Sequence, residues 1–178
     1  MTGPGGASDN SASGDGRTPD ERLADLGLTL PTVAAPLAAY VPAVIANGFV
    51  YTSGQLPFVD GKLPATGKVG TDLDVTEAAG LARICALNAI AAAASVTGGL
   101  SGIKRIVKVV GFVSSAPDFT AQAQVINGAS ELLIEVFGEA GRHARSAVGM
   151  AVLPLNTPVE VELVAELANT ALADPAGS

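Results

Sequence analysis

The stretch VEVELVAEL, residues 159–167 of this 178-residue chain, decides the fold class. Apolar residues occupy every second position, beginning with a valine and ending with a leucine. Because successive side chains of a β-strand point to opposite faces, this alternation predicts a strand with one face in a hydrophobic core. The predicted core face holds Val159, Val161, Leu163, Ala165 and Leu167, and the other face holds Glu160, Glu162 and Glu166.

Further stretches with β character precede this strand. Residues 145–153 form the first expected strand upstream, and a turn at 154–158, bounded by prolines, follows it. Residues 103–113 are apolar on both faces, which is typical of a strand between two layers or two subunits. Residues 41–45 and 48–53 are rich in β-forming residues, and the Asn-Gly pair between these two runs predicts a hairpin.

Two long helices are expected between these strands. The first spans about 77–95 and is capped by Thr76, with apolar residues recurring every three or four positions along one face. The second spans about 117–137. A short helix between Thr18 and Gly27 precedes all of these elements, with a proline and two acidic residues in its first turn.

The expected order after the short helix is β-β-α-β-α-β-β. Helices placed between strand pairs predict an α+β fold in which two helices cover one face of a mixed β-sheet. The other face would carry both polar and apolar side chains without a covering layer. A face of this kind favours an oligomer.

Residues 19–173 are expected to form one domain with flexible ends. Residues 1–18 are rich in Gly and Ser, which predicts a disordered tail, and residues 174–178 are expected to be a second flexible tail. The N-terminus lacks a basic start followed by an apolar core, and no run approaches the roughly 20 apolar residues of a membrane span. We therefore expect a cytoplasmic protein without a membrane partner.

Charge and the scarcity of metal ligands exclude several classes of function. Ten basic against seventeen acidic residues give a net charge of −7, so nucleic acid is not expected as a partner. The small basic cluster of Lys104, Arg105 and Lys108 lacks interleaved aromatic residues and is a weak RNA-binding signal. A single cysteine excludes an internal disulfide and a Cys-x-x-Cys metal site. Neither a metal nor an organic cofactor is expected.

Arg145 is the first candidate for a ligand-binding residue, because it stands at the start of a strand among small, uncharged neighbours. Its guanidinium could hold a carboxylate or phosphate through two parallel hydrogen bonds, and the alternative is an ordinary ion pair with Glu162 or Glu166. Glu160, on the polar face of the last strand, could hold a water or move a proton if burial changes its pKa. The alternative for Glu160 is a solvated surface carboxylate.

Three other residues carry reactive groups. Ser53 could orient a ligand through its hydroxyl or bond the backbone of its own turn. His143 is the only imidazole, and the nearby Arg142 and Arg145 favour its neutral form, so a loop-structuring histidine is preferred over a proton donor. Cys85 lies in the alanine-rich helix and is expected to be a small buried apolar residue.

Three separated motifs occur in the order and spacing of the RidA (YjgF) family signature, and the resemblance extends over about residues 40–167. They are YTSGQLP at 51–57 after Tyr40, GFV at 111–113 followed by Asp118-Phe119, and ARSAVGMAVLP at 144–154 followed by VEVELVA. The stretches GKVG, VINGAS and VFGEAGRHARS are similar to one branch of that family, labelled YjgF/chorismate-mutase-like "putative endoribonuclease".

The resemblance implies a chorismate-mutase-like fold and a homotrimer with clefts between its subunits. Members of the RidA branch hydrolyse reactive enamines and imines, such as 2-aminoacrylate and its imine, to 2-oxo acids and ammonia. By motif match, Arg145 would hold the substrate carboxylate, and Glu160 would position or protonate the attacking water. Tyr40 and Ser53 would line the cleft, and Asn127 would match a cleft asparagine. An imine is already electrophilic, so this reaction needs no metal or cofactor.

Two other functions stay open at this point. The same arginine would serve a non-catalytic trimer that binds 2-oxo acids, and Glu160 discriminates between the two functions because hydrolysis also needs a placed carboxylate. An endoribonuclease is the third hypothesis, and the acidic composition with a single histidine gives it little support. Ala147 stands where RidA deaminases often carry a cysteine. The roles of Arg142 and His143 in a cleft stay open as well.

Overall fold

The computed structural model describes residues 16–33 and 40–168 of the chain. The predicted tail at 174–178 and most of that at 1–18 lie outside the described residues, while Thr18 is the N-cap of the first helix. Three short 3-10 turns connect the main elements, at Leu100–Gly102, Gly138–Gly141 and Pro154–Asn156. The main elements are α1 (Pro19–Asp25), β1 (Ala43–Ala46), β2 (Phe49–Thr52), α2 (Val75–Thr97), β3 (Ile103–Ser114), α3 (Gln122–Phe137), β4 (Ala144–Met150) and β5 (Val159–Leu167).

The five strands form one mixed sheet in the order β1-β2-β5-β3-β4. β3 and β4 run parallel, whereas the other neighbouring pairs are antiparallel. Asn47 and Gly48 both have positive φ, as the turn of a two-residue hairpin requires, and this confirms the predicted β1–β2 hairpin. β5 lies between β2 and β3, and its odd-numbered residues are all buried, as the alternation in VEVELVAEL predicts.

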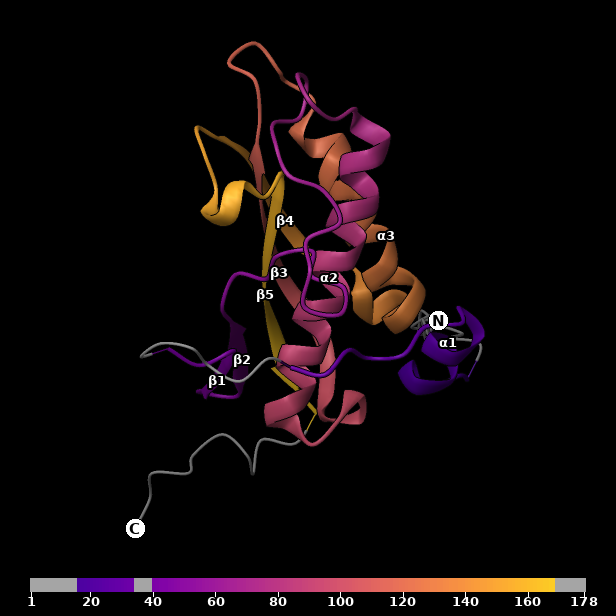
Figure 1. Cartoon of the computed structure of the whole chain (residues 1–178). Coiled ribbons are helices and arrows are strands. Elements are labelled where there is room, and N and C mark those ends of the chain that lie inside the picture. The colour runs from indigo at the N-terminus through magenta and orange to yellow at the C-terminus, as the bar shows by residue number, and fades with distance from the viewer. Residues whose placement is uncertain (1–15, 34–39, 169–178) are drawn as a thin grey trace, which may run out of the picture.

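α2 and α3 lie side by side on one face of the sheet (Figure 1). Buried side chains of both helices and of the sheet form one hydrophobic cluster, which includes Ile90 of α2, Leu132 of α3 and Val109 of β3. Eight of the buried residues of α2 are alanines, so the contacts of this helix rely on small side chains. The predicted α+β fold, with two helices on one face of a mixed sheet, is confirmed.

The predicted start of the first long helix is wrong. Asp74, and not Thr76, is the N-cap of α2: its carboxylate accepts a hydrogen bond from the backbone N–H of Glu77 at 2.8 Å. The Glu77 carboxylate accepts in turn from the backbone N–H of Asp74 at 2.9 Å. This reciprocal pair satisfies two backbone donors at the helix start, which explains why Asp74 is preferred.

Two other predicted boundaries also differ from the structure. α3 begins at Gln122 rather than near residue 117, because the backbone N–H of Phe119 closes a turn on the carbonyl of Ala116. The Gln122 side chain then donates to the carbonyl of Phe119 at 2.7 Å. β4 ends at Met150 rather than at 153, because β3, its only neighbour in the sheet, ends at the paired residue Ser114.

α2 is 23 residues long and apolar, so by length and composition alone it could cross a membrane. In the structure it packs against α3 and the sheet, and 56% of its most apolar window is buried inside the protein. Its polar side chains also make contacts within the chain: Arg83 pairs with Glu135 of α3 at 2.6 Å, and Asn88 donates to the carbonyls of Leu56 and Phe58. These are the contacts of a core helix.

Neither α2 nor α3 covers the second face of the sheet (Figure 1). Val44 of β1, Tyr51 of β2 and Val148 of β4 lie on this face and are 48%, 42% and 43% exposed. Glu160 and Glu162 of β5 lie on the same face between apolar neighbours. The second face therefore has the mixed, half-covered character that the strand pattern predicts.

Gly128 determines how closely α3 approaches α2, because a Cβ built on it would lie 2.0 Å from the carbonyl oxygen of Ala79. We expect Gly128→Ala to lower the free energy of unfolding by about 1–3 kcal/mol, since the two helix backbones must separate. Gly80→Ala is the matched control within α2: no atom lies within 4 Å of its added methyl group. That change should raise the unfolding free energy by about 0.5–1 kcal/mol. Urea denaturation of both variants measures the two effects, and a stabilised Gly128→Ala variant would contradict this view of the helix contact.

Candidate functional site

Arg145 is the second residue of β4 and lies directly opposite Val109 of β3, which is fully buried beneath the helices. Paired residues on neighbouring strands share a face, so the Arg145 side chain starts on the helix-covered face of the sheet. Its Nη1 donates hydrogen bonds to Asn127 Oδ1 at 2.9 Å and to Ser130 Oγ at 3.1 Å, both on α3. The structure thus brings Arg145 and Asn127 together.

Neither of the ion pairs considered for Arg145 is present. Glu166 binds Lys104 at 2.7 Å and Arg105 at 2.6 Å instead, and these two contacts lower the pKa of Glu166. Lys108 donates to Ser146 Oγ at 2.9 Å. The small basic cluster on β3 is therefore engaged within the chain. Over the described ranges, no three His, Cys, Asp or Glu side chains gather closely enough to hold a metal ion.

His143 extends the contacts of Arg145 through Ser130. The imidazole Nε2 lies 3.0 Å from Ser130 Oγ, and Nδ1 lies 2.6 Å from the carbonyl oxygen of Gly141. Burial lowers the pKa of His143; the Gly141 carbonyl opposes this, and the Arg145 charge lowers the pKa further. The predicted neutral, loop-structuring histidine agrees with these contacts. We call Asn127, Ser130, His143 and Arg145 the arginine cluster.

A hollow of about 210 Å³ opens beside the arginine cluster. Its lining contains Ser130, His143 and Arg145, together with Ile134 and Arg142. Arg142 is exposed and pairs through Nε with Glu139 at 2.8 Å. A small space beside a guanidinium that is held in place suits the carboxylate of a small ligand.

Glu160 of β5 lies opposite Phe112 of β3, on the face that the helices do not cover. Its carboxyl packs over Gly54: a Cβ built on this glycine would lie 1.8 Å from Glu160 Oε1, so a larger residue there would displace the Glu160 carboxyl. Burial, and to a smaller extent the charge of Glu162, raises the pKa of Glu160. No side chain or backbone group of the described residues forms a hydrogen bond or ion pair with this carboxyl.

Ser53 precedes Gly54 in the chain and is joined to the residue that follows Tyr40. The Ser53 hydroxyl donates to the carbonyl of Val41 at 2.7 Å, so it bonds backbone, although this backbone lies twelve residues away and not in its own turn as predicted. The bond is made to the residue next to Tyr40, whose side chain is 62% exposed. We call Tyr40, Ser53, Gly54 and Glu160 the glutamate cluster.

The two clusters do not meet within one chain. Arg145 belongs to the sheet row of Val109 and Leu163, which faces the helices, whereas Glu160 belongs to the row of Phe112 and Val148, which faces away. The sheet itself therefore separates the guanidinium from the carboxylate. A ligand that contacts both side chains must lie between two copies of the chain.

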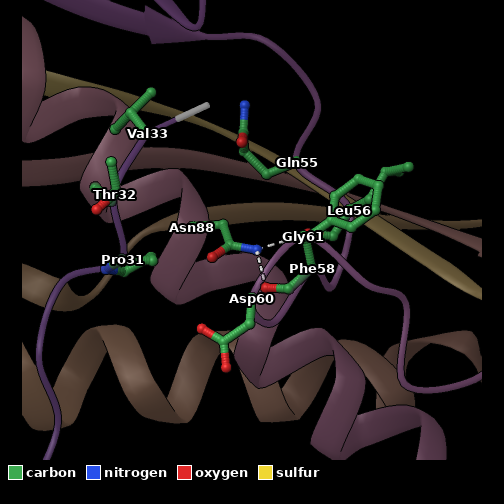
Figure 2. Close-up of a pocket in the computed structure, with 10 residues that line it drawn as sticks. Pro31, Thr32, Val33, Gln55, Leu56, Phe58, Asp60, Gly61 and Asn88 are labelled. Atoms are coloured by element: carbon green, nitrogen blue, oxygen red, sulfur yellow. Dashed lines mark hydrogen bonds between the residues drawn. The ribbon is translucent and has the colours of Figure 1, made fainter. Parts of the chain in front are cut away.

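A larger hollow of about 500 Å³ lies elsewhere, between residues 31–33, the loop around Phe58 and helix α2. Figure 2 shows Asn88 beside this hollow, where its amide donates to the carbonyls of Leu56 (2.8 Å) and Phe58 (3.1 Å). None of the residues predicted for the site lines this space. Cys85, on the same helix, is fully buried, which agrees with its predicted role as a small apolar residue.

The family model described as "YjgF/chorismate_mutase-like, putative endoribonuclease" matches residues 20–167. The match covers β1 to β5 and all of α1 except its first residue, Pro19. The chain belongs to the YjgF family. The resemblance drawn from its three sequence motifs is thereby confirmed.

Relatives within the YjgF family share most of the chain. Protein TCP17 of Trypanosoma cruzi is 47% identical over 148 residues, which cover 83% of this chain and 92% of TCP17. A crystal structure of a "putative endoribonuclease" from Shewanella oneidensis MR-1 is 42% identical with a TM-score of 0.82, covering 85% of this chain and all of the other. Escherichia coli TdcF, crystallised with bound serine, is 28% identical with a TM-score of 0.55, covering 77% of this chain and 96% of TdcF.

Sequence reasoning missed Ser130, which connects His143 to Arg145 in the YjgF fold. The stretch VINGAS carries both Ser130 and Asn127, three positions apart. Residues three apart lie on the same side of a helix. An expected contact between Arg145 and Asn127 could therefore have indicated a second contact with Ser130. No comparable signal exists for the separation of Arg145 and Glu160, because it depends on how three strands pair.

Proposed function

We propose that the protein hydrolyses reactive 2-imino acids, and the enamines in equilibrium with them, to 2-oxo acids and ammonia. The reaction takes place in a cleft between two copies of the chain within a homotrimer. One copy contributes the arginine cluster, with Arg145 binding the substrate carboxylate beside Asn127. The other copy contributes the glutamate cluster, with Tyr40 and Ser53 lining the cleft and Glu160 acting on the water.

The unpartnered carboxyl of Glu160 is the observation that carries this proposal. A half-buried carboxyl that no neighbouring donor stabilises is costly in its charged form and serves no evident structural purpose. Its raised pKa brings it closer to neutral pH, where a group can both accept and donate a proton. These are the properties that hydrolysis of an imine requires of its acid–base residue.

The proposed reaction balances with this one group. Glu160 takes a proton from a water as the water oxygen bonds to the imine carbon, and it passes this proton to the imine nitrogen, which leaves an amino group and a hydroxyl on that carbon. Glu160 then takes the hydroxyl proton and delivers it to the amino nitrogen, so that the C–N bond breaks and ammonia leaves as the C=O bond forms. Arg145 fixes the substrate carboxylate throughout, which places the imine carbon against the water.

The open face of the sheet supports a site shared between copies. Its partly exposed apolar residues would be covered by a second sheet in an oligomer, and the two clusters can only meet across such an interface. Trimers are typical of the YjgF family. We also propose a cytoplasmic location. We propose no nucleic-acid partner, because the net charge of −7 repels a phosphate backbone.

A ligand-binding protein without catalysis is the second candidate function. The bound serine of TdcF favours this second function, because serine is a small molecule with a carboxylate. The description of TdcF mentions a bound ligand and no reaction. Such a protein would use Arg145 as proposed and would not depend on Glu160. An endoribonuclease is less well supported, since two of the three basic side chains on β3 are neutralised by Glu166.

Imine hydrolysis by the wild-type protein tests the proposal. An amino-acid oxidase generates imines from several amino acids in turn, and semicarbazide traps whatever imine survives. We expect the protein to lower the yield of trapped semicarbazone with at least one amino acid and to leave the oxidase rate unchanged. Unchanged semicarbazone yields with every amino acid, combined with measurable binding of 2-oxo acids, would favour the ligand-binding protein instead.

A further inference from the structure

A directed chain of hydrogen bonds runs from the backbone of Gly141 to the guanidinium of Arg145. The Gly141 carbonyl can only accept, so the His143 proton lies on Nδ1. The unprotonated Nε2 of a neutral imidazole then accepts from the Ser130 hydroxyl, 3.0 Å away. The Ser130 oxygen, having donated its only proton, accepts from Arg145 Nη1 at 3.1 Å. Every donor in this chain is matched by one acceptor.

The chain determines which edge of Arg145 is available to a ligand. Nη1 carries two hydrogens, and both are used, one by Ser130 and the other by Asn127 at 2.9 Å. Nε and Nη2 donate to no group within residues 16–33 and 40–168. These two nitrogens form the side edge of the guanidinium, which matches a carboxylate with two parallel hydrogen bonds.

We propose that Ser130 and His143 are positioning residues for Arg145, which hold Nη1 so that the Nε–Nη2 edge receives the substrate carboxylate. This inference rests on the proposed function and adds to it two residues and a direction of approach. Asn127 alone would leave the guanidinium free to rotate about its contact. The second contact through Ser130, fixed in turn by His143 and the Gly141 carbonyl, removes that rotation before the ligand arrives, and preorganisation of this kind increases affinity.

The Ser130→Val and Ser130→Thr variants isolate this role, because the two side chains have the same shape and the same β-branching on α3. Threonine keeps the hydroxyl and valine lacks it. We expect Ser130→Val to raise the Kd for 2-oxobutyrate, measured by calorimetry, by about tenfold, since one hydrogen bond to a charged group is lost. Ser130→Thr should stay within about twofold of wild type. In the imine assay, Ser130→Val should raise KM and leave kcat nearly unchanged, because Glu160 is untouched. Equal Kd values for the valine and threonine variants would overturn the proposal.

His143 can be observed directly, because it is the only histidine in the chain. Long-range ¹H–¹⁵N spectra at neutral pH should show the neutral ring protonated on Nδ1, which is the minor tautomer of a free imidazole. The Nε2 resonance should shift in Ser130→Val and stay in place in Ser130→Thr. A ring protonated on Nε2 in the wild type would contradict the directed chain.

The outcomes separate this inference from the proposed function. If the wild type hydrolyses no imine, yet Ser130→Val alone weakens 2-oxobutyrate binding, the enzyme proposal fails and the positioning role stands. If imine hydrolysis is present and both variants match the wild type in Kd and KM, the positioning role fails and the enzyme stands. A wild type that does not bind 2-oxobutyrate would overturn the positioning role as well.

Discussion

Replacing Arg145 with alanine should raise the Kd for 2-oxobutyrate by about 100- to 1,000-fold, because the ligand carboxylate loses a two-point charged hydrogen bond. Calorimetry measures this effect. Arg145→Lys is the matched control: it keeps the positive charge without the planar fork, so its Kd should lie between those of the wild type and the alanine variant. The assembly should persist in both variants, because the hydrogen bonds that Arg145 makes within the described residues go to Asn127 and Ser130 on α3 of the same chain.

An unchanged Kd in Arg145→Ala would show that the arginine cluster is not the ligand site. A change in the assembly state, seen by light scattering, would instead assign Arg145 to the interface between copies. The two results are distinguishable, since a loss of assembly is visible without any ligand. Ser130→Thr provides a further reference, because it should behave like the wild type in both measurements.

Glu160→Gln should lower kcat for imine hydrolysis by about 100- to 10,000-fold, the usual contribution of a general acid–base group. The Kd for 2-oxobutyrate should change little, because the carboxylate of this ligand is bound by Arg145. Glu162→Gln is the matched control on the same face of β5, two residues away. Its kcat should stay close to that of the wild type. Equal losses of kcat in the two variants would contradict a specific role for Glu160.

Stability should respond to Glu160→Gln in the opposite direction to activity. The pKa of Glu160 is raised in the folded chain, so folding favours the protonated carboxyl and the charged form costs free energy at neutral pH. The unfolding free energy of Glu160→Gln should therefore equal or exceed that of the wild type at neutral pH. The difference should shrink as the pH falls through the raised pKa, because the wild-type carboxyl becomes neutral. Urea denaturation at several pH values measures this trend.

The sequence predicts the sheet better than it predicts the ends of the helices. Strict alternation gives the bounds of β5 without error, because a half-buried strand leaves a period of two in its residues. The N-cap of α2 is harder to predict from sequence, because Thr76 and Asp74 are both acceptable N-cap residues. Only the reciprocal contact with Glu77 favours Asp74. The start of α3 depends on the side chain of Gln122, which has no sequence signature.

The candidate site is predictable in its residues and not in its geometry. The motifs point to Arg145, Asn127 and Glu160 because these residue types occur at a family spacing. The opposite orientation of Arg145 and Glu160 follows from the register of β4, β3 and β5, which no single stretch of sequence determines. The Ser130 contact likewise depends on the angle at which α3 crosses the sheet.

In the proposed trimer, one catalytic site takes Arg145 from one copy and Glu160 from another. Arg145→Ala and Glu160→Gln chains, each inactive alone, can be unfolded, mixed in equal amounts and refolded together. In random trimers about a quarter of the clefts would combine an intact Arg145 with an intact Glu160, so about a quarter of the wild-type rate should return. Native mass spectrometry confirms that mixed trimers have formed. If mixed trimers form and no activity returns, Arg145 and Glu160 do not share a cleft between copies.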